Sequence, residues 1–265
     1  MTAADMPASA GFEIGRVVSR ALSVVGKNFF SFLALATLSA LPVIVFTFFS
    51  VLTAAIGLHM GPLIRPGTIS AVIVGFVAGY LLYFVFANLL QAAMMHGTVV
   101  TLNGGHASFF DCLATGVRHA VPLTIITVLA TLGMMVGFVL LVVPGIILAL
   151  AWSVIAPVRV TENTGILETF GRSARLTKGH RGSLFLLMLL FGVVVVVLDF
   201  VIRPLAGVSL VATPGAATPL VLVALTALVQ ILTAMIGASL YASAYYELRV
   251  IKEGVGPEKL AAVFA

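Results

Sequence analysis

Charged residues are scarce in this chain, where Asp, Glu, Lys and Arg make up only 9% of 265 residues. A soluble domain carries about 25% charged residues, because its surface must be hydrated. Hydrophobic residues account for 61% of the chain, and the mean hydropathy is +1.21. A chain of this length cannot bury so much apolar surface against itself. The composition therefore excludes a soluble globular protein and predicts that lipid surrounds most of the chain.

Cysteine is almost absent as well, since Cys112 is the single example. One cysteine excludes an intramolecular disulfide and any multi-cysteine metal site. Met94, Met95 and His96 resemble a soft-metal set, but without a second clustered His we interpret them as packing residues. No Ser–His–Asp arrangement, phosphate-binding loop or pair of carboxylates stands at a common depth. We therefore expect no enzyme activity, no catalytic residue, no cofactor and no metal.

Long uncharged stretches predict an all-α membrane protein with six transmembrane helices. The stretch from Ala120 to Val158 is nearly twice as long as the hydrocarbon thickness of roughly 30 Å requires, at 1.5 Å per residue. We expect it to turn at Pro144-Gly145, with a re-entrant hairpin as the alternative for the short fourth span. The predicted spans of this single membrane domain (1–265) are about residues 29–58, 69–95, 121–142, 146–160, 183–202 and 219–241.

The basic residues predict the orientation of these spans. If the N-terminus is cytoplasmic, only Arg65 and Arg203 of the fourteen Lys and Arg residues lie on the opposite side. The positive-inside rule then places both termini in the cytoplasm. The first apolar run is also far longer than the 7–15-residue core of a cleavable signal peptide. We therefore expect a multi-pass protein of the cytoplasmic membrane.

Three segments before the predicted hairpins have the pattern of interfacial amphipathic helices. In residues 11–27, apolar side chains fall on one helical face, and Arg16, Arg20 and Lys27 fall on the other. Such a helix lies in the membrane interface with its basic groups toward anionic headgroups. The pattern recurs less regularly in residues 106–119 and 165–181. We predict three units, each an interfacial helix followed by a transmembrane hairpin.

The second half of the chain carries four motifs in order. The first is a Pro-Gly turn at Pro144-Gly145, and the second is an apolar span that ends in Pro-x-x-x-x-Glu, from Pro157 to Glu162. The third is an Arg-Ser-x-x-Leu-Thr-x-Gly loop from Arg172 to Gly179, and the fourth is a helix that ends in Tyr-Tyr-x-Leu-Arg and a charged tail, from Tyr245 to Glu253. This part resembles bacterial integral membrane proteins grouped with the membrane domain of glycerophosphoryl diester phosphodiesterases. The resemblance implies a six-span protein of the bacterial cytoplasmic (inner) membrane. It supplies no catalytic residue.

A basic loop is the first candidate site, because Arg172, Arg175, Lys178 and Arg181 lie within ten positions. One interpretation is that they bind the phosphate groups of anionic lipid, together with the basic residues of segment 11–27. Near such a surface each Lys or Arg contributes about 1 kcal/mol to the free energy of binding to the membrane. The alternative is that the loop only sets topology. Nucleic acid is not an expected partner, because the loop offers no element that fits a groove.

Polar residues inside the spans are the second candidate. Asn88, Gln91 and Gln230 are candidates for a polar path through the membrane, as a transporter needs, or for hydrogen bonds between helices, each typically worth about 0.6 kcal/mol. Two charged pairs at span ends are interpreted as structural. They are Arg159 with Glu162, and Asp199 with Arg203.

The leading functional hypothesis is a non-enzymatic membrane protein whose basic cytoplasmic face engages anionic phospholipid in membrane or lipid homeostasis. The first alternative is a small-molecule transporter or permease. The second is an accessory subunit that binds a membrane or peripheral protein partner.

Overall fold

A computed structural model describes residues 11–39, 41, 66–212 and 218–254, and these residues form helices and no strand. The helices are α1 (Ile14–Lys27), a segment at Phe29–Ser39, α3 (Pro66–Leu102), α4 (Phe109–Leu140), α5 (Val142–Ala151), α6 (Ile155–Glu162), α7 (Ile166–Thr177), α8 (Arg181–Ala212) and α9 (Thr218–Glu253). By length and apolar composition, the described chain contains five candidate spans, or six if one bent pair counts as a span. The prediction of an all-α membrane protein is confirmed.

Helix α1 is a separate element, because the chain bends by 92° between α1 and Phe29–Ser39. Asn28 stabilises this bend, since its side-chain amide donates to the Thr101 hydroxyl at 2.8 Å. Val17, Ala21 and Val24 are buried and form the packed face of α1. Part of the apolar face of α1 therefore packs on the protein, whereas Leu22 on the same face is exposed. Beyond residue 41, the predicted first span lies outside the described residues.

Helix α4 differs from the prediction of an interfacial helix at 106–119 and a span at 121–142. It runs without interruption from Phe109 to Leu140, although Pro122 lies inside it. Proline removes one backbone donor from a helix and usually kinks it. Here Cys112 and Gly116 before Pro122, and Leu123 after it, are all buried. Packing on both sides of the proline offsets its local cost.

The close approach of α4 to α3 depends on Gly116. A Cβ atom at this position would lie 2.5 Å from the backbone oxygen of Leu89, which cannot move aside. We predict that Gly116→Ala destabilises the protein by about 1 to 2 kcal/mol through overpacking. Urea titration in mild detergent, followed by the fluorescence of the single tryptophan, Trp152, measures this change. Gly192→Ala is the control, because no described atom lies within 4 Å of its added Cβ. Equal stability of the two variants would contradict the prediction.

The turn after α4 also differs from the prediction. The chain turns at Leu141, whose backbone is extended, and Pro144-Gly145 lies in the first turn of α5. Proline is tolerated there because the first backbone N–H groups of a helix have no intrahelical acceptor. The fourth span is broken again at residues 152–154, and Val142–Glu162 together forms a candidate span of 21 residues. The predicted span at 146–160 is thus two short helices.

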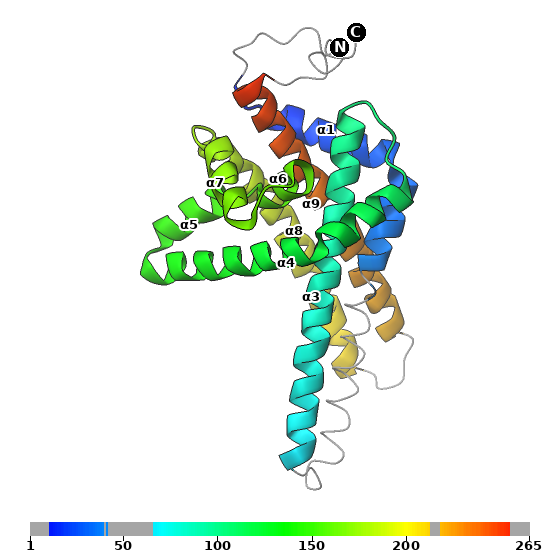
Figure 1. Cartoon of the computed structure of the whole chain (residues 1–265). Helices are drawn as coiled ribbons and strands as arrows, with labels where there is room; N and C mark the ends of the chain where they lie inside the picture. Colours follow the sequence, from blue (N-terminus) through cyan, green and yellow to red (C-terminus); the bar gives the residue numbers. More distant parts are fainter. Residues whose placement is uncertain (1–10, 40, 42–65, 213–217, 255–265) are drawn as a thin grey trace.

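The helices meet at one end of the molecule, where α1, α6, α7 and the C-terminal end of α9 lie together (Figure 1). Helix α4 crosses α3 instead of running beside it, and the α4–α5 hairpin projects away from the axis of α3. Helices α3 and α9 continue to Leu102 and Glu253, past the predicted span ends at 95 and 241. Almost every residue from Ala238 to Leu248 is buried, so this half of α9 is the centre of the core.

Candidate functional site

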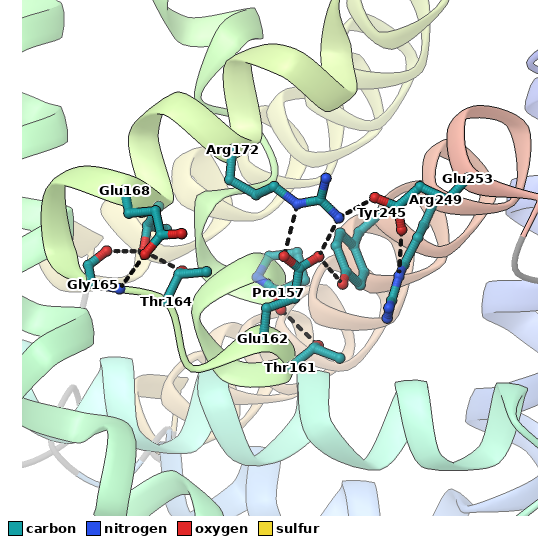
Figure 2. Close-up of polar contacts among 11 residues, drawn as sticks. Pro157, Thr161, Glu162, Thr164, Gly165, Glu168, Arg172, Tyr245, Arg249 and Glu253 are labelled. Carbon is teal, nitrogen blue, oxygen red and sulfur yellow. Dashed lines mark hydrogen bonds and ion pairs between the residues drawn. The ribbon is translucent and has the colours of Figure 1, made fainter.

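The charged end of the molecule is organised around Glu162, the last residue of α6. Arg172 of α7 binds this carboxylate with two hydrogen bonds, from Nε to Oε2 at 2.7 Å and from Nη2 to Oε1 at 3.0 Å. Tyr245 of α9 donates its hydroxyl to Oε1 at 2.7 Å (Figure 2). A two-pronged guanidinium–carboxylate contact is among the stronger polar interactions in proteins. Together with the Tyr245 hydrogen bond, this contact joins α6, α7 and α9 at a single carboxylate.

Glu253 at the end of α9 extends this network. Arg172 Nη2 also donates to Oε1 of Glu253, and Arg249 Nε donates to Oε2 at 3.0 Å. The hydrogen bond to Glu162 is the main cause of a raised pKa of the Arg172 guanidinium, and the hydrogen bond to Glu253 adds to it. Arg172 therefore keeps its charge and is held between two carboxylates.

Glu247 forms a second cluster with α1. Its side chain is only 2% exposed, and its carboxylate pairs with Arg20 and lies 2.9 Å from Arg16 Nε. The Arg20 guanidinium also lies over the ring of Tyr246, at 5.6 Å from its centroid. A buried carboxylate is costly unless charged partners compensate it. Two arginines from α1 supply this compensation and fix α1 onto α9.

These contacts place three of the predicted lipid-binding residues inside the protein. Arg172, Arg16 and Arg20 are partly buried and each is paired with a carboxylate. Ser173 and Thr177 on α7 are also fully buried, and both donate to the backbone oxygen of Ala151. The packed face of α7 is therefore largely polar. These side chains are already occupied in holding helices together.

Four other basic residues at this end are not paired in this way. Arg175, Lys178 and Lys252 are exposed, and Arg181 is partly exposed. Within the described chain, these four residues form no ion pair, and the Arg181 Nε is buried without a hydrogen-bond acceptor. The Lys252 Nζ reaches the α7–α8 turn, where it lies 3.8 Å from the point that a Cβ atom would occupy if Gly179 carried a side chain. We call Arg175, Lys178, Arg181 and Lys252 the basic turn.

His180 lies between Lys178 and Arg181 of the basic turn but adds little positive charge to this surface. Burial is the main cause of a lowered pKa of the His180 imidazole, and the positive charge of Lys252 lowers it further. A histidine with a pKa below its ordinary value near 6.5 is mostly neutral at pH 7. The lysines and arginines therefore carry the positive charge of the basic turn. Lys27, also predicted to bind lipid, is exposed at the C-terminal end of α1.

The predicted pairing of Arg159 with Glu162 is wrong. Arg159 donates to the backbone oxygen of Thr164, while Glu162 accepts from Arg172. The reason is that α6 ends at Glu162 and Asn163 adopts a left-handed conformation (φ 50°), which turns the chain back toward Arg159. The pairing of Asp199 with Arg203 lies outside the description, because the side chain of Arg203 is not described.

The predicted polar path divides into two parts. Asn88 is buried, and its amide donates to the Phe84 backbone oxygen at 2.8 Å and accepts from the Thr127 hydroxyl at 2.9 Å. It therefore joins α3 to α4. Gln91 and Gln230 instead lie together on a cavity between α3 and α9. Asn88 therefore follows the alternative interpretation, in which the polar residues form hydrogen bonds between helices.

Sequence reasoning missed Glu247 and Glu253 as organising residues. The signal was present for Glu247, because it is the single acid in the apolar stretch from Ala238 to Leu248. A lone charge within a buried helix requires a partner. The arginines of segment 11–27 are 227 positions away from it in the case of Arg20. No spacing rule connects residues so distant in the chain.

Comparisons with known proteins agree with the apolar helices. A UPF0259 membrane protein of Pectobacterium carotovorum subsp. carotovorum (strain PC1) is 30% identical to this chain over 100 residues. The match covers 36% of this chain and 40% of that protein. The chain is a multi-pass membrane protein. No family model and no solved structure matches it, so the resemblance to the phosphodiesterase membrane domain stays a prediction.

Proposed function

We propose that this protein is a non-enzymatic component of the bacterial cytoplasmic membrane, with both termini inside, whose basic turn engages anionic phospholipid in membrane or lipid homeostasis. The proposal rests on one observation. The described acids at this end neutralise Arg172, Arg16 and Arg20, but none pairs with Arg175, Lys178, Arg181 or Lys252. Four cations next to an apolar span suit the phosphates of a lipid surface.

The fold provides a rigid base for these cations. Arg175 lies in the last turn of α7, Lys178 follows that helix, Arg181 begins α8, and Lys252 comes from the last turn of α9. The contacts of Arg172 with Glu162 and Glu253 hold α7 next to this end of α9. Arg172 thus acts as a positioning residue for the basic turn. The lipid ligands are its exposed neighbours.

Native mass spectrometry of the protein extracted with its lipids tests this proposal. We predict that a variant with Gln at 175, 178, 181 and 252 retains at least tenfold less phosphatidylglycerol and cardiolipin than wild type, since four basic residues at about 1 kcal/mol each lower the binding free energy by more than the ~1.4 kcal/mol that a tenfold loss requires. The control carries Arg175→Lys and Arg181→Lys, which keep the charge and hence the topology signal. Accessibility of added surface cysteines verifies the topology of each variant.

The outcomes separate the candidate functions. Loss of anionic lipid in the Gln variant, with retention in the Lys control, supports lipid engagement. Equal lipid in all three forms contradicts it and assigns the basic turn to topology alone. In that case the accessory-subunit hypothesis becomes the better one, and affinity purification of wild type and the Gln variant tests it directly.

A further inference from the structure

The sequence contains two glutamines, Gln91 and Gln230, and both line the same cavity. The cavity has a volume of about 220 Å³ and lies between α3, α9 and the Phe29–Ser39 segment. Gln91 comes from α3 and Gln230 from α9, and both lie within candidate membrane spans. Residues 139 positions apart in the chain are thus brought to one place by the packing of α3 against α9.

The cavity presents polar groups that have no hydrogen-bond partner among the described residues. The amides of Gln91 and Gln230 and the hydroxyl of Tyr241 form no side-chain hydrogen bond to any described residue. An amide in a hydrocarbon environment is costly unless it forms a hydrogen bond. Gln230 is exposed, and Gln91 and Tyr241 are half-buried, so water or a hydrogen-bonding ligand can reach all three groups in the cavity.

The chemistry of the lining indicates the class of ligand. Ser39, Tyr83 and Thr233 add hydroxyl groups to the two amides and Tyr241. These groups both donate and accept hydrogen bonds. The described lining contains no Asp, Glu, Lys, Arg or His. A charged ligand at this depth would lack a counter-charge, at a much larger cost than a neutral one.

The remaining lining is apolar and small. Ala87, Met94, Ala234, Gly237 and Ala238 form it. The cavity's volume of about 220 Å³ is enough for several waters. This space suits a compact molecule with hydroxyl groups on one side and C–H groups on the other. Glycerol or a single sugar ring has this size and character.

We propose that this cavity is a binding site for an uncharged polyol, with Gln91 and Gln230 as its main hydrogen-bonding residues. The polyol is either a free molecule or the glycerol headgroup of an uncharged lipid, which share the same chemistry. The site does not depend on lipid binding by the basic turn, because the two share no residue.

Saturation-transfer difference NMR tests the site in lipid nanodiscs that contain no sugar detergent. The probes are glycerol, D-glucose and a monoacylglycerol, with acetate as the charged comparison. We expect transfer to the neutral probes in wild type and at least a fivefold loss when Gln91→Leu and Gln230→Leu are combined. Transfer to free glycerol or glucose assigns a free polyol, whereas transfer only to the headgroup protons of monoacylglycerol assigns a lipid.

Two further variants make the test decisive. Thr131→Val removes a hydroxyl from α4 outside the cavity, where it donates only to its own helix, and is expected to leave the transfer unchanged. Ala87→Phe fills the cavity from α3 and is expected to abolish transfer, even if the double Leu variant fails to fold. Absence of transfer to every neutral probe in wild type, or transfer unchanged by Ala87→Phe, would overturn the proposal and leave the cavity to water.

Discussion

Replacing Glu247 with Gln is expected to destabilise the protein by about 4 kcal/mol, because it removes the buried carboxylate partner of Arg20 and leaves Arg16 with the exposed Glu13 carboxylate instead of a buried one. The Glu247 side chain is only 2% exposed, so water cannot replace its carboxylate as the partner of the two arginines. Urea titration in mild detergent, followed by Trp152 fluorescence, measures the free energy of unfolding. We expect a large effect because α1 is attached to α9 mainly through this cluster and the apolar contacts of Val17, Ala21 and Val24.

The matched control is Glu13→Gln. Glu13 also pairs with Arg16, at 3.3 Å, but its side chain is 68% exposed. Exposed ion pairs contribute about 0 to 1 kcal/mol, so this variant should be close to wild type. A third variant combines Arg16→Met, Arg20→Met and Glu247→Leu. Removing all three charges leaves no buried charge of this cluster unpaired and only the exposed Glu13 without its arginine, so we expect this variant to be more stable than Glu247→Gln alone. Equal stability of the Glu247 and Glu13 variants would contradict the assigned role of burial.

Replacing Arg172 with Gln is expected to cost about 3 kcal/mol, since the substitution leaves the carboxylates of Glu162 and Glu253 close together without the cation between them. The effect is smaller than at Glu247 because these side chains are 15–25% exposed. The same urea titration measures it. Trp152 is a suitable reporter, because its ring packs edge-on against Phe170 of α7 at 5.0 Å between centroids.

Arg175→Gln is the control for Arg172→Gln. It removes the same charge from the same helix, but Arg175 is exposed and forms no ion pair in the described chain. We expect its stability to be within about 0.5 kcal/mol of wild type, as for most surface substitutions. Conversely, Arg175 belongs to the basic turn and its loss should weaken lipid retention. If Arg175→Gln destabilised the protein as much as Arg172→Gln, the distinction between positioning residue and lipid ligand would fail.

Composition was sufficient for the class of protein, and the helical periodicity of residues 11–27 located α1. Both are local properties. A chain with so few charged residues needs lipid as the solvent for most of its surface. An amphipathic helix is recognised from the period of 3.6 residues per turn over a short segment. The boundaries near Pro122 and Pro144 were less predictable, because proline has different effects inside a helix and in its first turn. Packing against α3 decided the first case, and the turn at Leu141 decided the second.

The roles of individual polar residues depended on tertiary contacts. From the sequence, Arg172 and Arg175 are equivalent, and so are Asn88 and Gln91. The structure separates each pair, because Arg172 reaches two carboxylates and Asn88 reaches Thr127, whereas Arg175 and Gln91 have no such partner among the described residues.

The sequence by itself therefore determined the solvent of this protein, its helical class and the side of the membrane where charge is expected to gather. These follow from totals and short periods along the chain. Only the tertiary structure decided which charges hold the helices together and which are available to a ligand. That decision depends on residues as distant as Arg20 and Glu247, whose distance in space no local pattern encodes.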